Sequence, residues 1–359
     1  PRIHVASLRG YERDAKTAKQ LLRANAPVAG ARQSWFAGVL LAANGGRPDR
    51  PADRARAEMT AHQPAALAVA TALLDYHDDL EANVAGAIDD VDTEFLHDLR
   101  VAVRRTRSVL KLLGDVLPDG TVSRVAPEFR WLGQITTPTR DLDVYLLGVD
   151  DMAASITNPD DLVPFAEHLR RRRNGVRREL VRQLRSRRFA ELRESWRADL
   201  EAVITTAGPD ATTAAQLANE RVHKTFRMVR KRAAAITAES PAEEIHTLRK
   251  KCKELRYLLE MFEPISDRRA YRQVIGDFKE LQKVLGEFQD GEVQAEALRG
   301  FAQEMIDSGD APAAALLAMG DLAARFDLRQ RAARSELAAH HDEYLGKRAV
   351  RHVDRLVAS

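Results

Sequence analysis

Several features common in other classes of protein are scarce or missing in this sequence of 359 residues. Its single cysteine, Cys252, allows neither a disulfide framework nor a zinc site built from thiolates. The longest apolar run, 313–319, is far shorter than the roughly 20 residues that a membrane helix requires, and the start of the sequence has no secretory signal pattern. We therefore expect a cytoplasmic protein without disulfides.

Catalytic motifs are missing as well. The sequence contains no phosphate-binding loop of the form G-x-x-x-x-G-K-[ST], no metalloprotease motif H-E-x-x-H and no nucleophile motif G-x-S-x-G. Cys252 falls on the apolar arc of its predicted helix, which favours a position in the core over a role as nucleophile. We therefore expect a chain that is not an enzyme and needs no cofactor.

Helix-forming residues dominate what is present. Apolar residues make up 45% of the chain and aromatic residues only 6%, and the abundance of alanine, leucine, arginine and glutamate favours helices. Short connections between antiparallel helices are typical of bundles. Periodicity and helix stops predict an all-α fold with helices near 63–88, 94–116, 122–135, 141–149, 161–184, 188–205, 212–238, 241–263, 268–289, 292–308 and 312–345.

The first 61 residues differ from the rest. Residues 3–8 fit a short strand, 11–23 fit a helix, and the run NGGRPDRP at 44–51 is typical of a linker. Because the sequence begins with Pro1 rather than methionine, we expect it to be a fragment of a longer chain. The predicted parts are an N-terminal segment and linker at 1–61, a first helical repeat at 62–205 and a second at 206–359.

An internal repeat indicates how the helices are organised. HDLR at 97–100 recurs 149 residues later as HTLR at 246–249, and the apolar positions that follow match as well. Further on, LG and RDLDV (140–144) of the first copy match LG and QDGEV (289–293) of the second, if a four-residue insertion, TTPT, precedes Arg140. Two related halves, each a bundle of about four helices, are the simplest architecture.

Each copy of the motif places a row of cations along one helix. On a helix, positions 0, 3, 7, 10 and 14 fall within an arc of about 80°. Apolar residues occupy the neighbouring arc, so each helix is expected to pack one face into its bundle and to expose the cations beside it. The first row comprises His97, Arg100, Arg104, Arg107 and Lys111, and the same positions of the second copy hold His246, Arg249, Lys253, Arg256 and Glu260.

The net charge of +3 hides a strong separation of charge. The windows 97–111, 168–188, 221–232 and 246–256 hold 26 basic and three acidic residues, a net charge of +23, which leaves −20 for the remainder. A solvated face usually mixes signs, because like charges three or four residues apart destabilise a helix. The doubled row therefore favours binding of a linear polyanion over an ordinary solvated surface.

Phosphate suits these rows for geometric reasons. Arginine holds phosphate oxygens with a planar fork, and lysine adds a mobile point charge. His97 and His246 head the rows in the first helical turn, where a phosphate would meet free backbone N–H groups and favour the protonated ring. For each histidine, a structural role in the interior is the ordinary alternative.

The pattern H-x-L-R-x₃-[RK]-x₂-R followed by an apolar run, present twice, resembles the conserved histidine α-helical domain (CHAD) family. The second copy, HTLRKKCKELRYLLEMF, is especially similar, and the likeness covers about residues 62–345. The resemblance implies two four-helix bundles that face each other across a basic groove and bind inorganic polyphosphate without catalysis, in the cytoplasm and at polyphosphate granules. Carried over by position, the groove residues are His97, Arg100, Arg104, Arg107, His246, Arg249, Lys253 and Arg256, with Arg105, Lys111, Arg227, Lys231 and Lys250 in second rank.

Two further features bear on this resemblance. Glu260 stands in place of the last cation of the second row, so we expect another residue to close that end of the groove. Residues 1–50, especially SLRGYERDAKTAKQLL, resemble the end of a CYTH (triphosphate tunnel) domain, which often precedes CHAD in one chain. That likeness implies the C-terminal part of a CYTH–CHAD protein whose triphosphatase-type domain is missing, and no catalytic residue is carried over from it.

A metal site is one alternative function. The runs at 94–97 and 243–246 both read E-x-x-H, the spacing used by helical di-iron proteins, but Arg100 and Arg249 would repel the metals from one turn further on. The run SPAE at 240–243 reads as a capping box, which accounts for its glutamate in another way. Asp141 and Asp143 could also chelate a cation, although helix capping or pairing with the basic row fits them better.

Nucleic-acid binding is the other alternative, because basic rows bind any phosphate backbone at low salt. Single-stranded nucleic acid is usually held by aromatic rings that stack on its bases. Beside the rows, only Tyr257 offers such a platform, and its counterpart in the first copy is Ser108. We therefore expect nucleic acid to bind only non-specifically.

Overall fold

The computed structural model describes residues 59–356 with gaps at 209–211 and 238, and, in a separate N-terminal unit, only Thr17 and Leu21. Thr17 and Leu21 are helical, within the helix predicted at 11–23. The predicted strand at 3–8, the linker at 44–51 and almost all of the CYTH-like segment lie outside the described residues.

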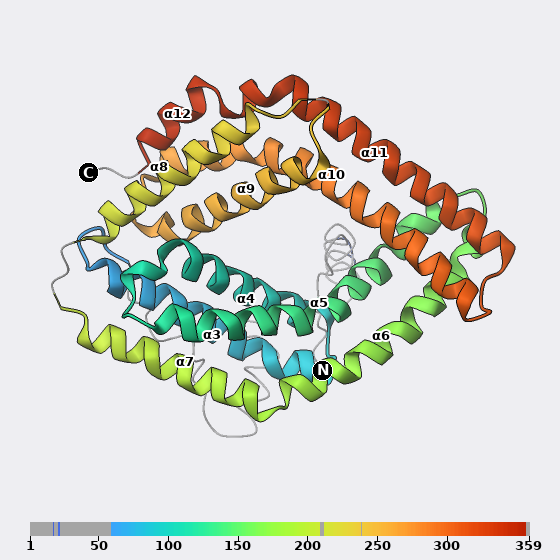
Figure 1. The fold of residues 1–359 in the computed structure, drawn as a ribbon, viewed down its shortest axis with the longest axis horizontal. Coiled ribbons are helices and arrows are strands. Elements are labelled where there is room, and N and C mark those ends of the chain that lie inside the picture. The colour runs from blue at the N-terminus through green and yellow to red at the C-terminus, as the bar shows by residue number, and fades with distance from the viewer. Residues whose placement is uncertain (1–16, 18–20, 22–58, 209–211, 238, 357–359) are drawn as a thin grey trace. The chain divides into compact units, whose positions relative to one another are not determined.

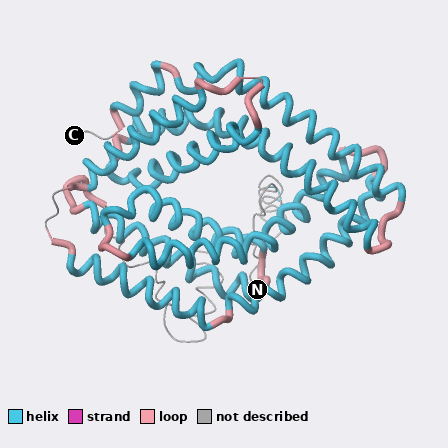
Figure 2. Tube along the Cα trace, viewed as in Figure 1, coloured by secondary structure: helices cyan, strands magenta, loops and turns pink. Residues whose placement is uncertain are grey.

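The described residues form ten α-helices and no strand (Figures 1 and 2), which confirms the predicted all-α class. None of these helices is both long and apolar enough to cross a membrane. The helices are α3 (Ala65–Asp89), α4 (Thr93–Leu113), α5 (Thr121–Ala154), α6 (Val163–Leu184), α7 (Arg187–Thr206), α8 (Ala214–Ala233), α9 (Ala242–Phe262), α10 (Arg268–Asp307), α11 (Ala313–Leu345) and α12 (Lys347–Asp354). Short 3₁₀ turns, Gly114–Val116, Pro159–Leu162 and Glu263–Ile265, follow α4, precede α6 and follow α9.

Two predicted helix breaks are wrong, because α5 and α10 each continue through them. Pro138 lies inside α5, and the hydroxyls of Thr136 and Thr137 donate to backbone carbonyl oxygens one turn earlier, both at 2.8 Å. Gly291 lies inside α10 at a point where α11 passes so close that a side chain would not fit. A Cβ atom at Gly291 would stand 2.8 Å from the carbonyl oxygen of Phe326. Close packing, rather than a turn, therefore explains this glycine.

The uninterrupted helices also correct the predicted repeat alignment. Because neither α5 nor α10 is broken, the offset between the copies cannot change along them. Arg140 lies beside the first histidine of the motif, and Gln289 contacts the second, which sets the offset at 149 throughout. The four-residue insertion before Arg140 is therefore absent, and the two LG pairs are not equivalent. They lie about one helical turn apart in the true register, so they share nearly the same face.

Two hydrophobic cores hold the helices. The larger core contains residues of α3, α4, α7, α8, α9 and α12, with the N-terminal parts of α5 and α10. The smaller core lies where the C-terminal parts of α5 and α10 meet α6 and α11, and it includes Phe165 and Phe301. Helices of both repeats contribute to each of the two cores, which the prediction of one separate bundle per repeat did not include. In Figure 1 the long helices α5 and α10 run from one packing region into the other.

Candidate anion-binding site

Helices α4 and α9 carry the two predicted rows and follow the predicted pattern of burial. Asp92 caps α4, its carboxylate accepting a hydrogen bond of 2.9 Å from the backbone N–H of Glu94. The predicted capping box before α9 is wrong, since the Ser240 hydroxyl accepts from the Thr237 N–H instead, at 3.1 Å. The apolar arcs of both helices are buried in the larger core, and Cys252 is part of it, as predicted.

Two ion pairs join α4 directly to α9. Arg105 Nη2 lies 3.2 Å from Glu260 Oε2, and Lys111 Nζ lies 2.6 Å from Glu254 Oε1. Arg105 and Glu254 occupy equivalent positions of the repeat, as do Lys111 and Glu260, so the charge at each position is inverted between the copies. In each pair, the first of these positions in one copy contacts the second position in the other copy. The two pairs are therefore related by the pseudo-twofold symmetry of the repeat.

These pairs change the expected roles of three residues. Arg105 and Lys111, second-rank candidates for the groove, direct their charges at acids of the opposite helix. Glu260 also forms an ion pair with Arg256, whose Nε lies 3.0 Å from Glu260 Oε1, so Glu260 connects the end of the second row to the first. Arg105 is therefore the residue of the other row that closes the groove at the Glu260 end.

The centres of the two rows converge on one cluster. Burial and the nearby charges of Arg249, Arg104 and Arg256 lower the pKa of Lys253 to about 8. Arg104 belongs to α4 and Lys253 to α9, so cations of both helices act on one another across the site. Arg249, whose pKa burial and Arg104 lower, adds a third cation with one distant carboxylate, Asp290 at 4.0 Å.

Tyr257 lies within this cluster but offers no stacking surface. The guanidinium carbons of Arg104 and Arg256 lie 6.0 Å and 5.5 Å from the centre of its ring, and only 4% of the residue is exposed. The Nε–H group of Arg104 is buried without an acceptor in the described part of the chain, whereas Arg256 Nε lies 3.0 Å from the carboxylate of Glu260. Unpaired donors of this kind are rare in folded proteins and mark a place where an acceptor can bind.

Helix α5 forms the floor beneath the first row. Arg100 Nη1 donates to the hydroxyls of Thr136 and Thr137 at 2.9 and 2.8 Å and to the carbonyl oxygen of Gly133 at 3.2 Å. Arg107 lies over the same glycine, where a Cβ atom would meet its Nη1 at 2.9 Å. The TTPT segment and Gly133 therefore shape the site by holding one arginine and leaving room for the other.

Each histidine at the head of a row meets the same position of the following long helix. Burial, together with the charge of Arg140 on α5, lowers the pKa of His97. His246 Nδ1 contacts the side-chain oxygen of Gln289 on α10. Arg140 also donates to the carbonyl oxygen of Thr93 at 3.4 Å. In the sequence analysis Arg140 served only to align the repeats and was not placed in the site. The signal that could have located it is its alignment with Gln289, the residue that contacts the second histidine.

The remaining candidates are less closely joined to the cluster. Arg227 and Lys231 lie exposed on α8, and Lys250 lies exposed on α9; none of the three forms an ion pair within the described residues. Arg130, which sequence reasoning did not select, is exposed on α5 and its charge acts on Arg107.

Most of the arginines in the basic window at 168–188 are neutralised within the fold. Arg173 pairs with Asp90 and with the buried Asp143, whose pKa burial raises, and this bond fixes one of the two aspartates considered as a chelator. Most of the positive charge of this window is therefore balanced by acids of the fold, unlike that of Arg104 and Lys253 in the α4–α9 cluster, which form no ion pair within the described residues. The other pairs of this window join Arg171 to Asp310, Arg172 to Glu304, Arg177 to Asp90, Arg182 to Glu179, Arg187 to Glu191 and Arg188 to Glu128.

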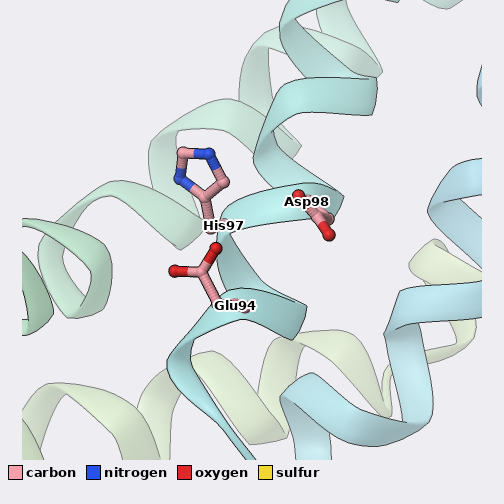
Figure 3. A group of neighbouring side chains, drawn as sticks. All are labelled: Glu94, His97 and Asp98. Atoms are coloured by element: carbon pink, nitrogen blue, oxygen red, sulfur yellow. The ribbon is translucent and has the colours of Figure 1, made fainter. Parts of the chain in front are cut away.

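The metal-site alternative finds little support in this geometry. In the described part of the chain, the one group of three possible ligands is Glu94, His97 and Asp98, all from the first turns of α4 (Figure 3). The E-x-x-H run of α9 contributes nothing to it, whereas a di-iron site needs ligands from several helices. Arg140 Nη1 lies 4.0 Å from Glu94 Oε1, so a cation already lies beside this carboxylate and would repel a metal.

Comparison with known proteins identifies the family. Residues 71–299 match the CHAD domain. The chain belongs to the CHAD family. Two uncharacterized proteins of Mycobacterium tuberculosis, MT2285 of strain CDC 1551 / Oshkosh and Rv2226 of strain ATCC 25618 / H37Rv, are each 29% identical over 215 residues, which is 56% of this chain and 39% of theirs. This CHAD chain spans about two fifths of the length of these relatives.

Solved structures share the CHAD fold. The crystal structure of the CHAD domain from the plant Ricinus communis matches with a TM-score of 0.68 and 24% identity, over 81% of this chain and 95% of that one. PptA from Streptomyces chartreusis matches with a TM-score of 0.56 and 15% identity, over 78% and 99%. At these identities the likeness shows the helical fold, and the binding chemistry must be argued from the residues of this chain.

Proposed function

We propose that this protein binds inorganic polyphosphate in a basic groove lined by α4 and α9, without catalysing a reaction. The observation that carries the proposal is the convergence of Arg104 with Lys253 and Arg249, cations from both rows. Burial and the nearby charge of Arg104 lower the pKa of both Lys253 and Arg249. Such a cluster is costly to leave empty, and a polyanion relieves the cost. In this proposal the protein resides in the cytoplasm, at deposits of polyphosphate.

A linear phosphate polymer fits the cluster better than a single phosphate does. The first row, from His97 to Lys111, extends over roughly 21 Å of helix axis. Arginine forks along it supply paired N–H donors for successive phosphate groups. Exposed Arg107 of α4 and Arg130 of α5 continue the positive charge beyond the centre of the site. A ligand that repeats its charge along a line can contact all of them at once.

Nucleic acid is the less favoured ligand. The ring of Tyr257 is covered by two arginines and is 4% exposed, so it supports no base stacking. The proposal therefore rests on backbone phosphate alone, which a polyphosphate chain presents more densely than a nucleic acid does.

Titration of long-chain polyphosphate, duplex DNA and heparin against the protein at two salt concentrations tests this proposal. We expect polyphosphate to bind most tightly, with a log–log salt slope of about −1 for each phosphate that is neutralised, if polyphosphate condenses counterions as DNA does. Heparin controls for a simple response to charge density. DNA binding as tight as polyphosphate binding at physiological salt would contradict the proposal.

Alkaline pH is expected to weaken polyphosphate binding through Lys253. Its pKa of about 8 lies below the value of about 10.4 for a free lysine, so it loses its proton as the pH rises through 8. Bound anion favours the charged form, and affinity should therefore fall by about tenfold between pH 7 and pH 9.5, with proton uptake on binding at pH 8.5. Lys253→Arg stays charged over this range and should flatten the profile. A fall of equal size in Lys253→Arg would assign the pH dependence to another group.

A further inference from the structure

Tyr257 lies at the centre of the contact between α4 and α9. Two ion pairs join these helices, Arg105 to Glu260 and Lys111 to Glu254. On α9 the two acids stand three positions after and three positions before Tyr257, so all three share one side of the helix. Only 4% of Tyr257 is exposed, so its ring is buried where the helices meet.

The repeat equivalent of Tyr257 is a small residue. Ser108 stands midway between Arg105 and Lys111 on α4, and its hydroxyl donates to the carbonyl oxygen of Arg104 on the same helix at 2.9 Å. Equivalent residues midway between symmetric contacts lie beside the pseudo-twofold axis, where two aromatic rings would compete for the same space. One ring therefore occupies a position that belongs equally to both rows.

Guanidinium groups from both helices lie against this ring. The guanidinium carbon of Arg104, on α4, is 6.0 Å from the ring centre, and that of Arg256, on α9, is 5.5 Å from it. The phenol also lies within electrostatic range of Arg249. The face of an aromatic ring attracts a cation electrostatically, and more strongly where water is excluded. A single side chain thus contacts cations of the first row and of the second.

Arg104 has few other contacts that could fix its side chain. Its Nε–H is buried without an acceptor, and its guanidinium forms no ion pair within the described residues. The like charges of Arg249 and Lys253 lie near it and repel it. Without the ring, we expect Arg104 to turn away from these cations, and a ligand would then have to order it again. Ordering a long side chain on binding costs free energy.

We propose that Tyr257 is a positioning residue of the anion site, whose ring holds Arg104 and Arg256 in the groove before the ligand binds. The ring does not contact the ligand, because the two arginines cover it. It raises affinity by lowering the cost of ordering one arginine from each row, without adding a charge. This inference rests on the proposed function, since it concerns the same groove and takes polyphosphate as the ligand.

Titration of long-chain polyphosphate against variants of the full chain tests the proposal. Leucine fills much of the same space but attracts no cation, so Tyr257→Leu should weaken binding by about fivefold to thirtyfold, the effect of losing two cation–ring contacts. Tyr257→Phe keeps the ring and should bind within about twofold of the parent. Tyr76→Leu is the matched control and should bind as the parent does. The ring of Tyr76 lies 5.7 Å from the guanidinium carbon of Arg105, but that arginine is directed at Glu260.

Two further variants separate positioning from a general loss of fit. Pentafluorophenylalanine at position 257 keeps the shape of phenylalanine but removes the negative charge from the ring face, so it should bind several times more weakly than Tyr257→Phe. It also keeps the test valid if Tyr257→Leu folds poorly, which urea denaturation would show. In an Arg104→Gln background, Tyr257→Leu should cost less affinity than it does in the parent, because one of the two cations on the ring is already gone.

Four results would overturn the proposal. They are parental affinity in Tyr257→Leu, equal affinity with phenylalanine and pentafluorophenylalanine at position 257, a fully additive loss in the Arg104→Gln background, and an equal loss in Tyr76→Leu. The first two show that the ring face does not matter, the third that it does not act through Arg104, and the fourth that any such contact matters equally. Absence of polyphosphate binding by the parent chain would instead contradict the proposed function, so the two failures are distinguishable.

Discussion

Replacing Arg104 or Lys253 by glutamate is expected to weaken polyphosphate binding by about tenfold to a hundredfold. Each change removes a cation from the centre of the cluster and leaves an anion facing the ligand. At an effective dielectric constant of about 20, one charge pair about 4 Å apart is worth about 4 kcal/mol, and screening by salt reduces this without abolishing it. Affinity at two or more salt concentrations is the measurement.

A double variant and a control variant test whether the two residues act on one ligand. Because the two residues belong to different helices and face one ligand, the double reversal should bind more weakly than either single variant, with a salt slope less steep by about one unit for each cation removed. Arg331→Glu, an exposed change on α11 outside the cluster, should bind as the parent does. Parental affinity in both single variants would show that the rows are only a solvated surface.

Glu254→Lys is expected to lower the free energy of unfolding by about 3–5 kcal/mol, the range for leaving a buried charge without its partner. The Glu254 side chain is only 10% exposed and receives hydrogen bonds of 2.6 Å from both Lys111 and Lys251. Burial alone would raise the pKa of Glu254, but the two lysines lower it overall. Its stabilising effect is therefore present above about pH 4.3, the value for a free glutamate, and is lost as the pH falls through the lower value in the fold. Urea denaturation at pH 7 measures the change.

A second substitution separates the ion pair from simple loss of fit. Lys111→Glu added to Glu254→Lys restores a pair of opposite charges between α4 and α9, so the double variant should recover part of the lost stability. Additive losses in the double variant would mean that the pair does not couple the helices. Lys111→Met alone should change polyphosphate affinity by less than about threefold, because this lysine is 62% exposed and directed at Glu254 rather than at the ligand.

The class of fold and the centre of the site could be predicted from the sequence because both rest on local periodicity. A helix brings residues three, four and seven apart onto one face whatever surrounds it, so the rows from His97 and from His246 followed from spacing alone. The doubled motif also identified Arg104 and Lys253 as equivalents, and the structure brings them to one cluster.

What could not be predicted depends on contacts between distant segments. Pro138 and Gly291 read locally as helix stops, but threonine hydroxyls and the close approach of α11 keep both helices continuous. The pairing of Arg105 with Glu260 joins residues 155 positions apart, and no spacing rule indicates it. For the same reason the arginines of α6, all alike in sequence, could not be divided into paired and unpaired ones.

The inverted charges at the α4–α9 contact restrict which halves can meet. If two first repeats met through the same symmetry, Arg105 would face Lys111 at both contacts, and two second repeats would bring Glu254 against Glu260. Both like pairings place two repulsions where the native contact has two attractions. A first repeat therefore accepts only a second repeat as its neighbour, whether that repeat comes from its own chain or from another. Exchange of halves between two molecules would preserve the groove, whereas self-association of either half would not form it.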